Sequence, residues 1–194
     1  MKEFALQPFG DARPGAEHRL TAIVDRGRQD LRLAYALAGD LAGLHIPAPA
    51  AGPGRGHRLW ENTCFECFFG VEGEQRYWEV NLSPSGEWNV YAFSDYRQGM
   101  REEESVGQVG VQGYGQARQY LLKAVVPLPA GLAMDASLEL GLSAVLRRAD
   151  GRCDYRALVH PASRPDFHHR GGFVVILPPA ATVLSAGARG EDRF

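Results

Sequence analysis

Two glutamates and an asparagine interrupt stretches of sequence that otherwise favour buried β-strands. Glu66 lies within "TCFECFFGV", and Glu79 and Asn81 lie within "YWEVNL". Carboxylate and amide groups at such positions can hydrogen-bond to the hydroxyls of a polar ligand. Two carboxylates can also serve as the acid and base of a glycoside hydrolase, but only when roughly 5 to 9.5 Å separates them. No sequence pattern supplies that separation, so binding is the stronger hypothesis.

The alternation of side chains along a strand assigns Glu66 to one face of the expected sheet. It shares that face with Cys64 and Phe68. Burying an unpaired carboxylate costs free energy. Glu66 is therefore either an edge or solvent-facing charge, or it has a buried partner or a ligand hydroxyl.

The second stretch belongs to a predicted hairpin with residues 83–86 at its tip. On its first strand Glu79 and Asn81 share one face, and Trp78 lies on the other. Trp88, on the second strand, alternates in register with valine and alanine. We therefore expect both tryptophans in the core, and we expect Glu79 and Asn81 where a ligand would make contact.

The cysteines of "CFEC" have the spacing of a metal knuckle or a redox pair. In a strand, however, positions three residues apart point to opposite faces. Only Cys153 remains as a further thiol. We predict no metal site and expect Cys64 and Cys67 to be buried free thiols.

The histidines show no catalytic arrangement. His168 and His169 follow Asp166 in "DFHHR", but no serine or cysteine has the sequence context of a nucleophile elbow. Phosphate-binding glycine loops and the metal motif HExxH do not occur in the sequence. We predict that the protein is not an enzyme.

Apolar residues recur with a period of two, in runs bounded by Gly, Pro, Asp or Ser, which indicates strands rather than helices. Ten such runs predict an all-β fold, an antiparallel β-sandwich of jelly-roll type in a single domain. The strands are expected at Lys2–Leu6, Arg19–Asp25, Asp30–Ala38, Cys64–Val71, Arg76–Leu82, Glu87–Phe93, Arg118–Val126, Ser137–Arg147, Asp154–Val159 and Gly172–Leu177.

The domain is expected to span residues 1–177. Residues 178–194 lack strand patterning, and we expect them to form a disordered tail. Two other stretches favour loops. Residues 47–56 are rich in Pro, Ala and Gly, and residues 100–116 combine acidic residues with repeated glycines. The second stretch is either a lid over a site or a crossover.

The composition argues against several partners. The chain has 194 residues and a net charge of −2, and its basic residues are spread along the sequence. We therefore predict neither a nucleic-acid partner nor a membrane partner. No apolar run has the length of a signal peptide or a membrane span, and three cysteines, an odd number, fit a reducing compartment. We expect a cytoplasmic protein.

Three segments together resemble the DOMON-like domains related to family 9 carbohydrate-binding modules. In order they are "LWENTCFECFF", "YWEVNLSPSGEWNVYAFSDYRQGM" and "HPASRPDFHHRGGFVVIL", between about Leu59 and Leu177. The resemblance implies a β-sandwich that binds a sugar or haem without catalysing a reaction.

The resemblance also implies particular site residues. Trp60 is similar to an aromatic residue that stacks on the sugar in these relatives. Glu66 is similar to a glutamate that accepts hydrogen bonds from the hydroxyls of the sugar. Asn81 matches the asparagine of an Arg-x-Asn pair, but Glu79 stands where the arginine would be.

A second stacking tryptophan of those relatives has no counterpart in "SRPDFHHRGG", where Arg164 or Phe167 would have to replace it. Stacking on a broad ring is the main apolar contact that a sugar makes. The resemblance therefore predicts the fold better than it predicts sugar specificity. We expect His168, in the same segment, to face the ligand as well.

Three hypotheses follow from these observations. The first is a concave face that binds a saccharide or similar polyol, with one ring for stacking and a few groups that orient hydroxyls. The second is haem binding, for which Met100 and His168 are the available axial ligands. The third is a protein-interaction module in which Glu66 and Glu79 are edge charges that block strand addition.

Overall fold

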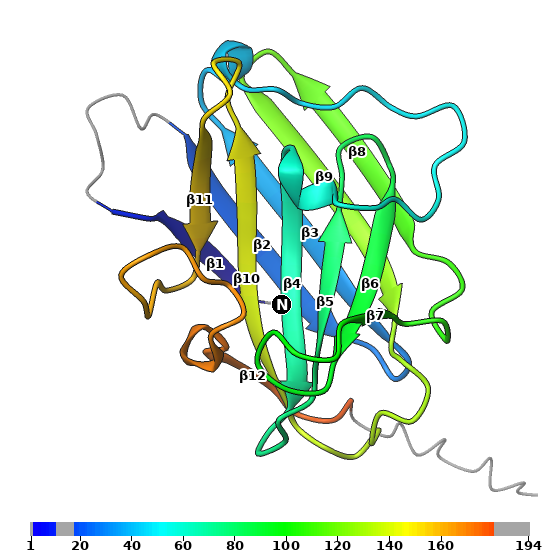
Figure 1. Cartoon of the computed structure of the whole chain (residues 1–194). Helices are drawn as coiled ribbons and strands as arrows, with labels where there is room; N and C mark the ends of the chain where they lie inside the picture. Colours follow the sequence, from blue (N-terminus) through cyan, green and yellow to red (C-terminus); the bar gives the residue numbers. More distant parts are fainter. Residues whose placement is uncertain (1, 11–17, 181–194) are drawn as a thin grey trace, which may run out of the picture.

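A computed structural model describes residues 2–10 and 18–180, which form an antiparallel β-sandwich (Figure 1). One layer consists of β1 (Lys2–Pro8), β2 (Arg19–Arg26), β3 (Asp30–Ala38), β9 (Gln119–Pro127) and β8 (Gly110–Gln116). The other consists of β4 (Cys64–Val71), β5 (Tyr77–Leu82), β6 (Trp88–Phe93), β7 (Arg101–Glu102), β10 (Leu138–Arg147), β11 (Cys153–Ala157) and β12 (Val175–Leu177). The fold class is as predicted.

The two layers are parts of one curled sheet, because β1 pairs with β2 on one side and with β11 on the other. The strand order is β7-β6-β5-β4-β10-β11-β1-β2-β3-β9-β8, and β12 pairs with β10. The described residues also contain three short 3-10 turns: η1 (Leu41–Gly43), η2 (Leu59–Glu61) and η3 (Arg170–Gly172). None of the helical segments in the described residues is long and apolar enough to cross a membrane.

All ten expected strands are present, with ends that shift by up to three residues. The loop expected over residues 100–116 is instead largely strand, because it contains β7 and β8. Gly113 and Gly115 weaken the local strand pattern, yet they let β8 approach the Tyr120 ring of β9 closely. Pairing with β9 therefore makes residues 110–116 a strand although their own sequence only weakly favours one. The expected disordered tail lies outside the described residues from position 181 onward.

The core lies between the layers and takes alternate residues from each strand. Phe65, Cys67 and Phe69 of β4 face inward, and so do Trp78 and Trp88, which are 1% and 4% exposed. Both tryptophans are therefore core residues, as predicted. Their burial removes large apolar surfaces from water and fixes the register of the β5–β6 hairpin.

The outer face of β4, β5 and β6 is also buried, so that these strands are covered along their whole length. A second cluster of rings, here called the outer cluster, lies on this face. Its members are Phe68, Tyr77, Tyr91, Phe93 and Phe173, with Trp60 and Phe167 packed against them. The sandwich therefore has apolar material on both sides of its second layer.

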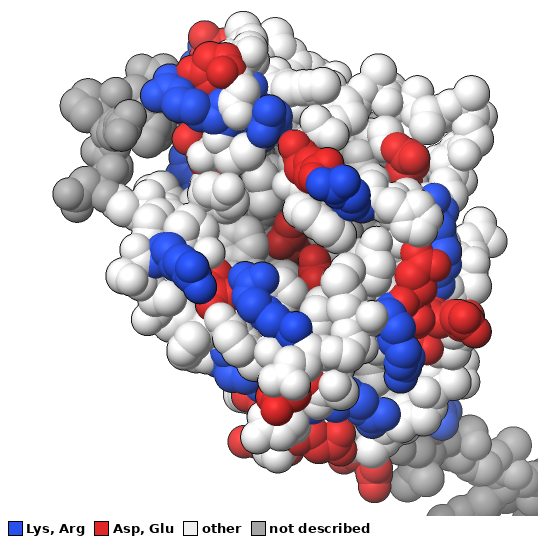
Figure 2. Space-filling model, viewed as in Figure 1, with Lys and Arg blue, Asp and Glu red and all other residues white. Residues whose placement is uncertain are grey.

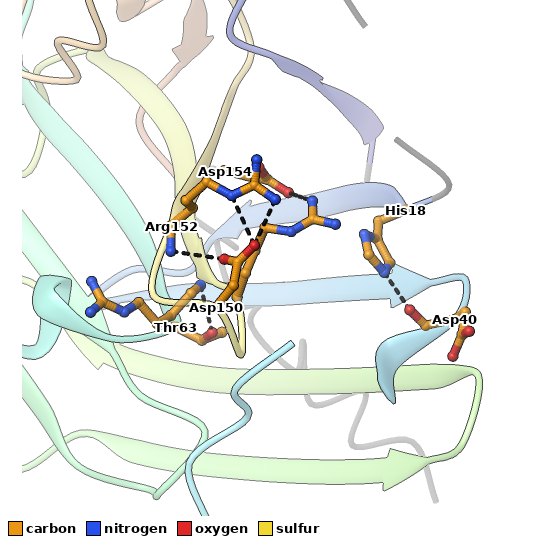
Figure 3. A network of polar contacts seen from close by, with 8 residues as sticks. His18, Asp40, Thr63, Asp150, Arg152 and Asp154 are labelled. Carbon is orange, nitrogen blue, oxygen red and sulfur yellow. Dashed lines mark hydrogen bonds and ion pairs between the residues drawn. The ribbon is translucent and has the colours of Figure 1, made fainter. Parts of the chain in front are cut away.

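The hairpin between β10 and β11 is held by charged groups at its tip (Figure 3). Asp150 accepts a hydrogen bond from the Arg152 backbone at 3.0 Å and pairs with its guanidinium at 2.6 Å. Arg148 pairs with Asp154 at 2.6 Å, and the Arg147 backbone donates to Thr63 Oγ1 at 3.0 Å. The two ion pairs therefore stabilise the hairpin itself, and the bond to Thr63 holds β10 beside the start of β4.

A buried hydrogen bond joins the two layers at the position of Glu66. Tyr35 of β3 is completely buried, and its hydroxyl donates to the backbone carbonyl of Glu66 at 2.6 Å. Its ring packs against Phe65 with centroids 5.2 Å apart. Tyr35 therefore supports from inside the core the strand that carries the Glu66 carboxylate on the other face.

Replacing Tyr35 by phenylalanine keeps the ring and removes only the hydroxyl that spans the layers. We expect Tyr35→Phe to lower the free energy of unfolding by about 1 to 3 kcal/mol, because a buried acceptor loses its partner. Urea denaturation measures this change. Tyr114→Phe is the matched control, since the Tyr114 hydroxyl is on an exposed side chain and bonds to Gln112, its neighbour on the same strand. Equal stability of the two variants would contradict the assigned role.

Candidate ligand-binding site

A pocket of about 370 Å³ opens on the outer face of β4, β5, β10 and β11. Figure 2 shows a hollow near the middle of this side of the molecule, with acidic atoms at its bottom. The lining residues are Trp60, Glu66, Phe68, Glu79, Phe93, Arg97, Met100, Val145, Tyr155, Pro165, Phe167 and His168. The pocket thus brings together five of the seven residues that the sequence indicated, namely Trp60, Glu66, Glu79, Phe167 and His168.

The floor of the pocket contains Glu66 and Glu79, which are only 2% and 5% exposed. Glu66 stands opposite Asn81 of β5 and Ser143 of β10, and the Ser143 hydroxyl donates to Glu66 Oε2 at 3.4 Å. Both β4 and β5 have neighbours on each side. The alternative that Glu66 and Glu79 are solvent-facing edge charges is therefore wrong, because interior strands carry them.

Asn81 does not line the pocket but supports it from below. It is completely buried, and its Nδ2 donates to Glu79 Oε1 at 2.8 Å. Its Oδ1 lies 3.4 Å from the Cys64 thiol, while Cys67 faces the core on the other side of the strand. We expected Asn81 to contact a ligand, but in the structure it orients Glu79 instead. The two cysteines face opposite ways, as predicted.

His168 is fixed by a chain of hydrogen bonds that begins at the Arg97 backbone. The Arg97 amide donates to the Tyr77 hydroxyl at 3.1 Å, and that hydroxyl lies 2.8 Å from His168 Nδ1. Because Tyr77 is fully buried, its proton needs an acceptor, which assigns Nδ1 as acceptor and leaves the proton on Nε2. Nε2 faces Glu79 Oε2 at 3.8 Å.

His168 remains neutral at physiological pH in this position. Burial lowers its pKa to about 4, and the charge of Arg97 acts in the same direction against the opposing charge of Asp166. The neutral ring offers its Nε2 proton as a donor at the floor of the pocket. It adds no positive charge beside Glu79.

Arg97 is a pocket residue that sequence reasoning did not single out. Its backbone is left-handed, with φ of 53°, and its guanidinium pairs with Asp166 at 2.8 Å. The hydroxyl of Tyr96 donates to the other oxygen of Asp166. These bonds tie the turn after β6 to the segment before η3, so that the two loops together form one wall. A left-handed arginine in a turn gives no signal at the sequence level.

The rings of the pocket come from both the floor and the surrounding loops. Trp60 lies on η2 and is half-buried, edge-on to Tyr91 with centroids 5.8 Å apart. Phe167 packs against Phe68 at 6.4 Å and against Tyr155 at 6.1 Å. Of the two expected replacements for a second stacking ring, Phe167 therefore lines the pocket.

Arg164, the other expected replacement, is exposed and does not line the pocket. Met100, which was considered only as a haem ligand, lies at the pocket with 48% of its surface exposed. Tyr155 of β11 was not predicted either: β11 forms a local hairpin with β10, but only the long-range pairing of β10 with β4 brings Tyr155 to the pocket.

Burial raises the pKa of both floor carboxyls. For Glu66 burial is the main cause and the charge of Glu79 adds to it, while the hydrogen bond from Ser143 opposes the shift. Burial raises the pKa of Glu79 to about 7, against the effects of the Asn81 hydrogen bond and the Arg97 charge. Since two like charges at this depth disfavour each other, the pair retains a proton near neutral pH.

No family model matches the chain, and no curated protein matches its sequence. Among solved structures, it is similar to a candidate carbohydrate-binding protein from Bacteroides uniformis, with 16% sequence identity and a TM-score of 0.63. The match covers 88% of this chain and 84% of that one. The two proteins share a fold.

Two structures of family 9 carbohydrate-binding modules from Caldicellulosiruptor kristjanssonii are less similar. One, solved with cellotriose, has 7% identity and a TM-score of 0.49 and covers 81% of this chain and 72% of its own. The other, solved with glucose, has 9% identity and a TM-score of 0.43, with 76% and 69% covered. Similarity at this level supports no argument about the site. Membership among DOMON-like domains stays a prediction.

Replacing Glu79 by glutamine removes one buried charge and keeps the acceptor for Asn81 Nδ2. A carboxyl whose pKa rises on folding does not destabilise the fold below its unfolded value of 4.5, and destabilises it progressively as pH rises through about 7. We therefore expect Glu79→Gln to gain stability relative to the wild type between about pH 5 and about pH 8. The gain is on the order of 3 kcal/mol, since each pKa unit corresponds to ~1.4 kcal/mol.

Thermal or urea denaturation across this pH range measures the gain. Glu72→Gln is the control, because Glu72 is an exposed glutamate in the turn between β4 and β5. A difference between Glu79→Gln and wild type that stays constant with pH would show that Glu79 is already ionised at low pH.

Proposed function

We propose that the pocket binds a saccharide or a similar polyol and does no chemistry on it. The observation that carries this proposal is the convergence of rings and buried acceptors in one open pocket. Trp60 and Phe167 offer faces or edges for the apolar side of a sugar ring. Glu66, Glu79 and the His168 Nε2 proton can fix the orientation of hydroxyls at the floor.

The fold similarity supports the same proposal. The protein from Bacteroides uniformis that shares this fold is described as a candidate carbohydrate-binding protein. The sequence resemblance independently pointed to sugar-binding relatives, and it did so through Trp60 and Glu66, both of which line the pocket. A fold alone does not determine a function, so the pocket chemistry remains the main argument.

The arrangement of the two carboxyls favours binding over hydrolysis. Phe68 is opposite Glu79, and Glu66 is opposite Asn81, so the two glutamates are diagonal neighbours on adjacent strands of the same floor. Glycoside hydrolases place their carboxyls on either side of the bond that breaks. Here both carboxyls approach a ligand from one side, which suits recognition of its hydroxyls.

Calorimetric titration of the purified protein with a panel of neutral and amino mono- and oligosaccharides tests the proposal. We expect saturable binding of at least one sugar, accompanied by a change in tryptophan fluorescence from Trp60. Trp78 and Trp88 are buried in the core and should not respond directly. Trp60→Ala should weaken binding roughly fivefold or more, because loss of ring contact costs about 1 kcal/mol or more.

Tyr114→Ala is the control for this substitution, since Tyr114 is an exposed ring on β8 in the other layer. Its binding constant should match that of the wild type. The proposal fails if a folded wild-type sample binds no sugar in the panel, or if Tyr114→Ala weakens binding as much as Trp60→Ala does.

Haem binding is the second candidate, because Met100 and His168 line the same pocket. The residues present do not fit it well. Nδ1 of His168 is engaged by Tyr77, and Nε2, the nitrogen that would bind iron, faces the carboxyl of Glu79. An acidic floor also repels the propionates of haem. We therefore expect no Soret band after haem addition. A strong Soret band that shifts in His168→Ala would instead favour haem binding over saccharide binding.

A further inference from the structure

The electrostatic balance of the pocket constrains the kind of saccharide that it can take. Within the described residues, the floor carries two carboxyls, and the only lining residue with a fixed positive charge is Arg97. Arg97 is half-exposed at the wall, and its guanidinium already pairs with Asp166. His168 is neutral. The pocket is therefore acidic at its floor and close to neutral at its wall.

Both floor carboxyls retain unused acceptor capacity. No donor in the described residues hydrogen-bonds to Glu66 Oε1, and the contact of Glu66 Oε2 with Ser143 is long at 3.4 Å. Glu79 Oε1 accepts a hydrogen bond from Asn81, whereas the nearest donor to Glu79 Oε2 in the described residues is His168 Nε2 at 3.8 Å, too far for a good hydrogen bond. One oxygen of each carboxylate is thus left for a ligand.

The rings around the carboxyls suit a cation as well as a sugar ring. Trp60, Phe68, Phe93, Tyr155 and Phe167 all line the pocket. Aromatic faces attract ammonium groups through their quadrupoles, and the attraction grows when the site excludes water. Carboxylates and rings together are the groups that a protonated amine satisfies best, because it has three donors and a full positive charge.

We propose that the ligand carries a protonated amine, and that the pocket takes an amino sugar in preference to the neutral sugar of the same shape. This inference rests on the proposed saccharide function and specifies its ligand class. The ammonium group lies at the floor and bridges Glu66 and Glu79. The sugar ring then lies against Trp60 or Phe167.

Proton linkage provides an independent consequence. Without a ligand, the pair of floor carboxyls retains a proton near neutral pH, because burial raises both pKa values and the charge of Glu79 raises that of Glu66 further. An ammonium group between them stabilises both ionised forms, so it displaces that proton. The other titratable groups near this pair in the described residues are Cys64, Tyr77, Tyr91, Arg97, Tyr155, Asp166 and His168. Of these, none is expected to change its charge near pH 7.

Paired titrations test the proposal in the wild-type protein. Glucosamine is compared with glucose, and galactosamine with galactose, at about pH 7 by calorimetry in two buffers of different ionisation enthalpy. We expect the amino sugar of at least one pair to bind roughly tenfold or more tightly than its neutral partner. We also expect binding of the amino sugar to release protons, whereas the neutral sugar releases none.

Glu79→Gln and Glu66→Gln should each reduce the preference for the amine over the neutral sugar to about threefold or less, because each amide removes a charge that attracts the ammonium group. Glu72→Gln should keep the full preference. If both members of a pair bind equally, or the neutral sugar binds more tightly, this inference is overturned and the proposed function stands. If no member of any pair binds and no neutral oligosaccharide binds either, both this inference and the proposed saccharide function fail.

Discussion

The alternation of side chains along β4 and β5 is the constraint on which the rest of the structure depends. Both strands are buried on both faces, so every residue must suit either the core or the outer cluster. Phe65, Phe69 and Trp78 face the core. Glu66 and Glu79 face the pocket. A shift of register by one residue would place two carboxylates in the core and the tryptophan in the pocket.

Burying two carboxyls on an interior sheet requires support, and the structure supplies it from several elements. Ser143 and Asn81 donate from the neighbouring strand positions, Tyr35 holds the strand from inside the core, and Tyr77 orients His168 beside the pair. None of these groups neutralises the charge completely. The raised pKa values of Glu66 and Glu79 reflect the remaining cost of burying their negative charge. A positively charged ligand is the simplest way to offset that cost.

Period-two patterning predicted the strands and the faces of Glu66, Glu79 and the two buried tryptophans, because these depend on local alternation. It missed β8, whose glycines hide its pattern and whose pairing with β9 is decided by tertiary contact. It also missed Arg97, because a left-handed backbone and an ion pair with Asp166, about seventy residues later in the sequence, bring this side chain to the pocket. Asn81 was assigned to the correct face, but side-chain hydrogen bonding places it beneath Glu79 rather than at the surface.

The same alternation separates the evolution of the pocket from that of the core. Position 79 can exchange one functional group for another while Trp78 and Val80, its neighbours on both sides, keep their packing in the opposite direction. Alternate positions of one strand therefore determine the stability of the fold and the chemistry of the pocket separately. A lineage built on this sheet can change what it recognises by single substitutions without first having to rebuild its interior.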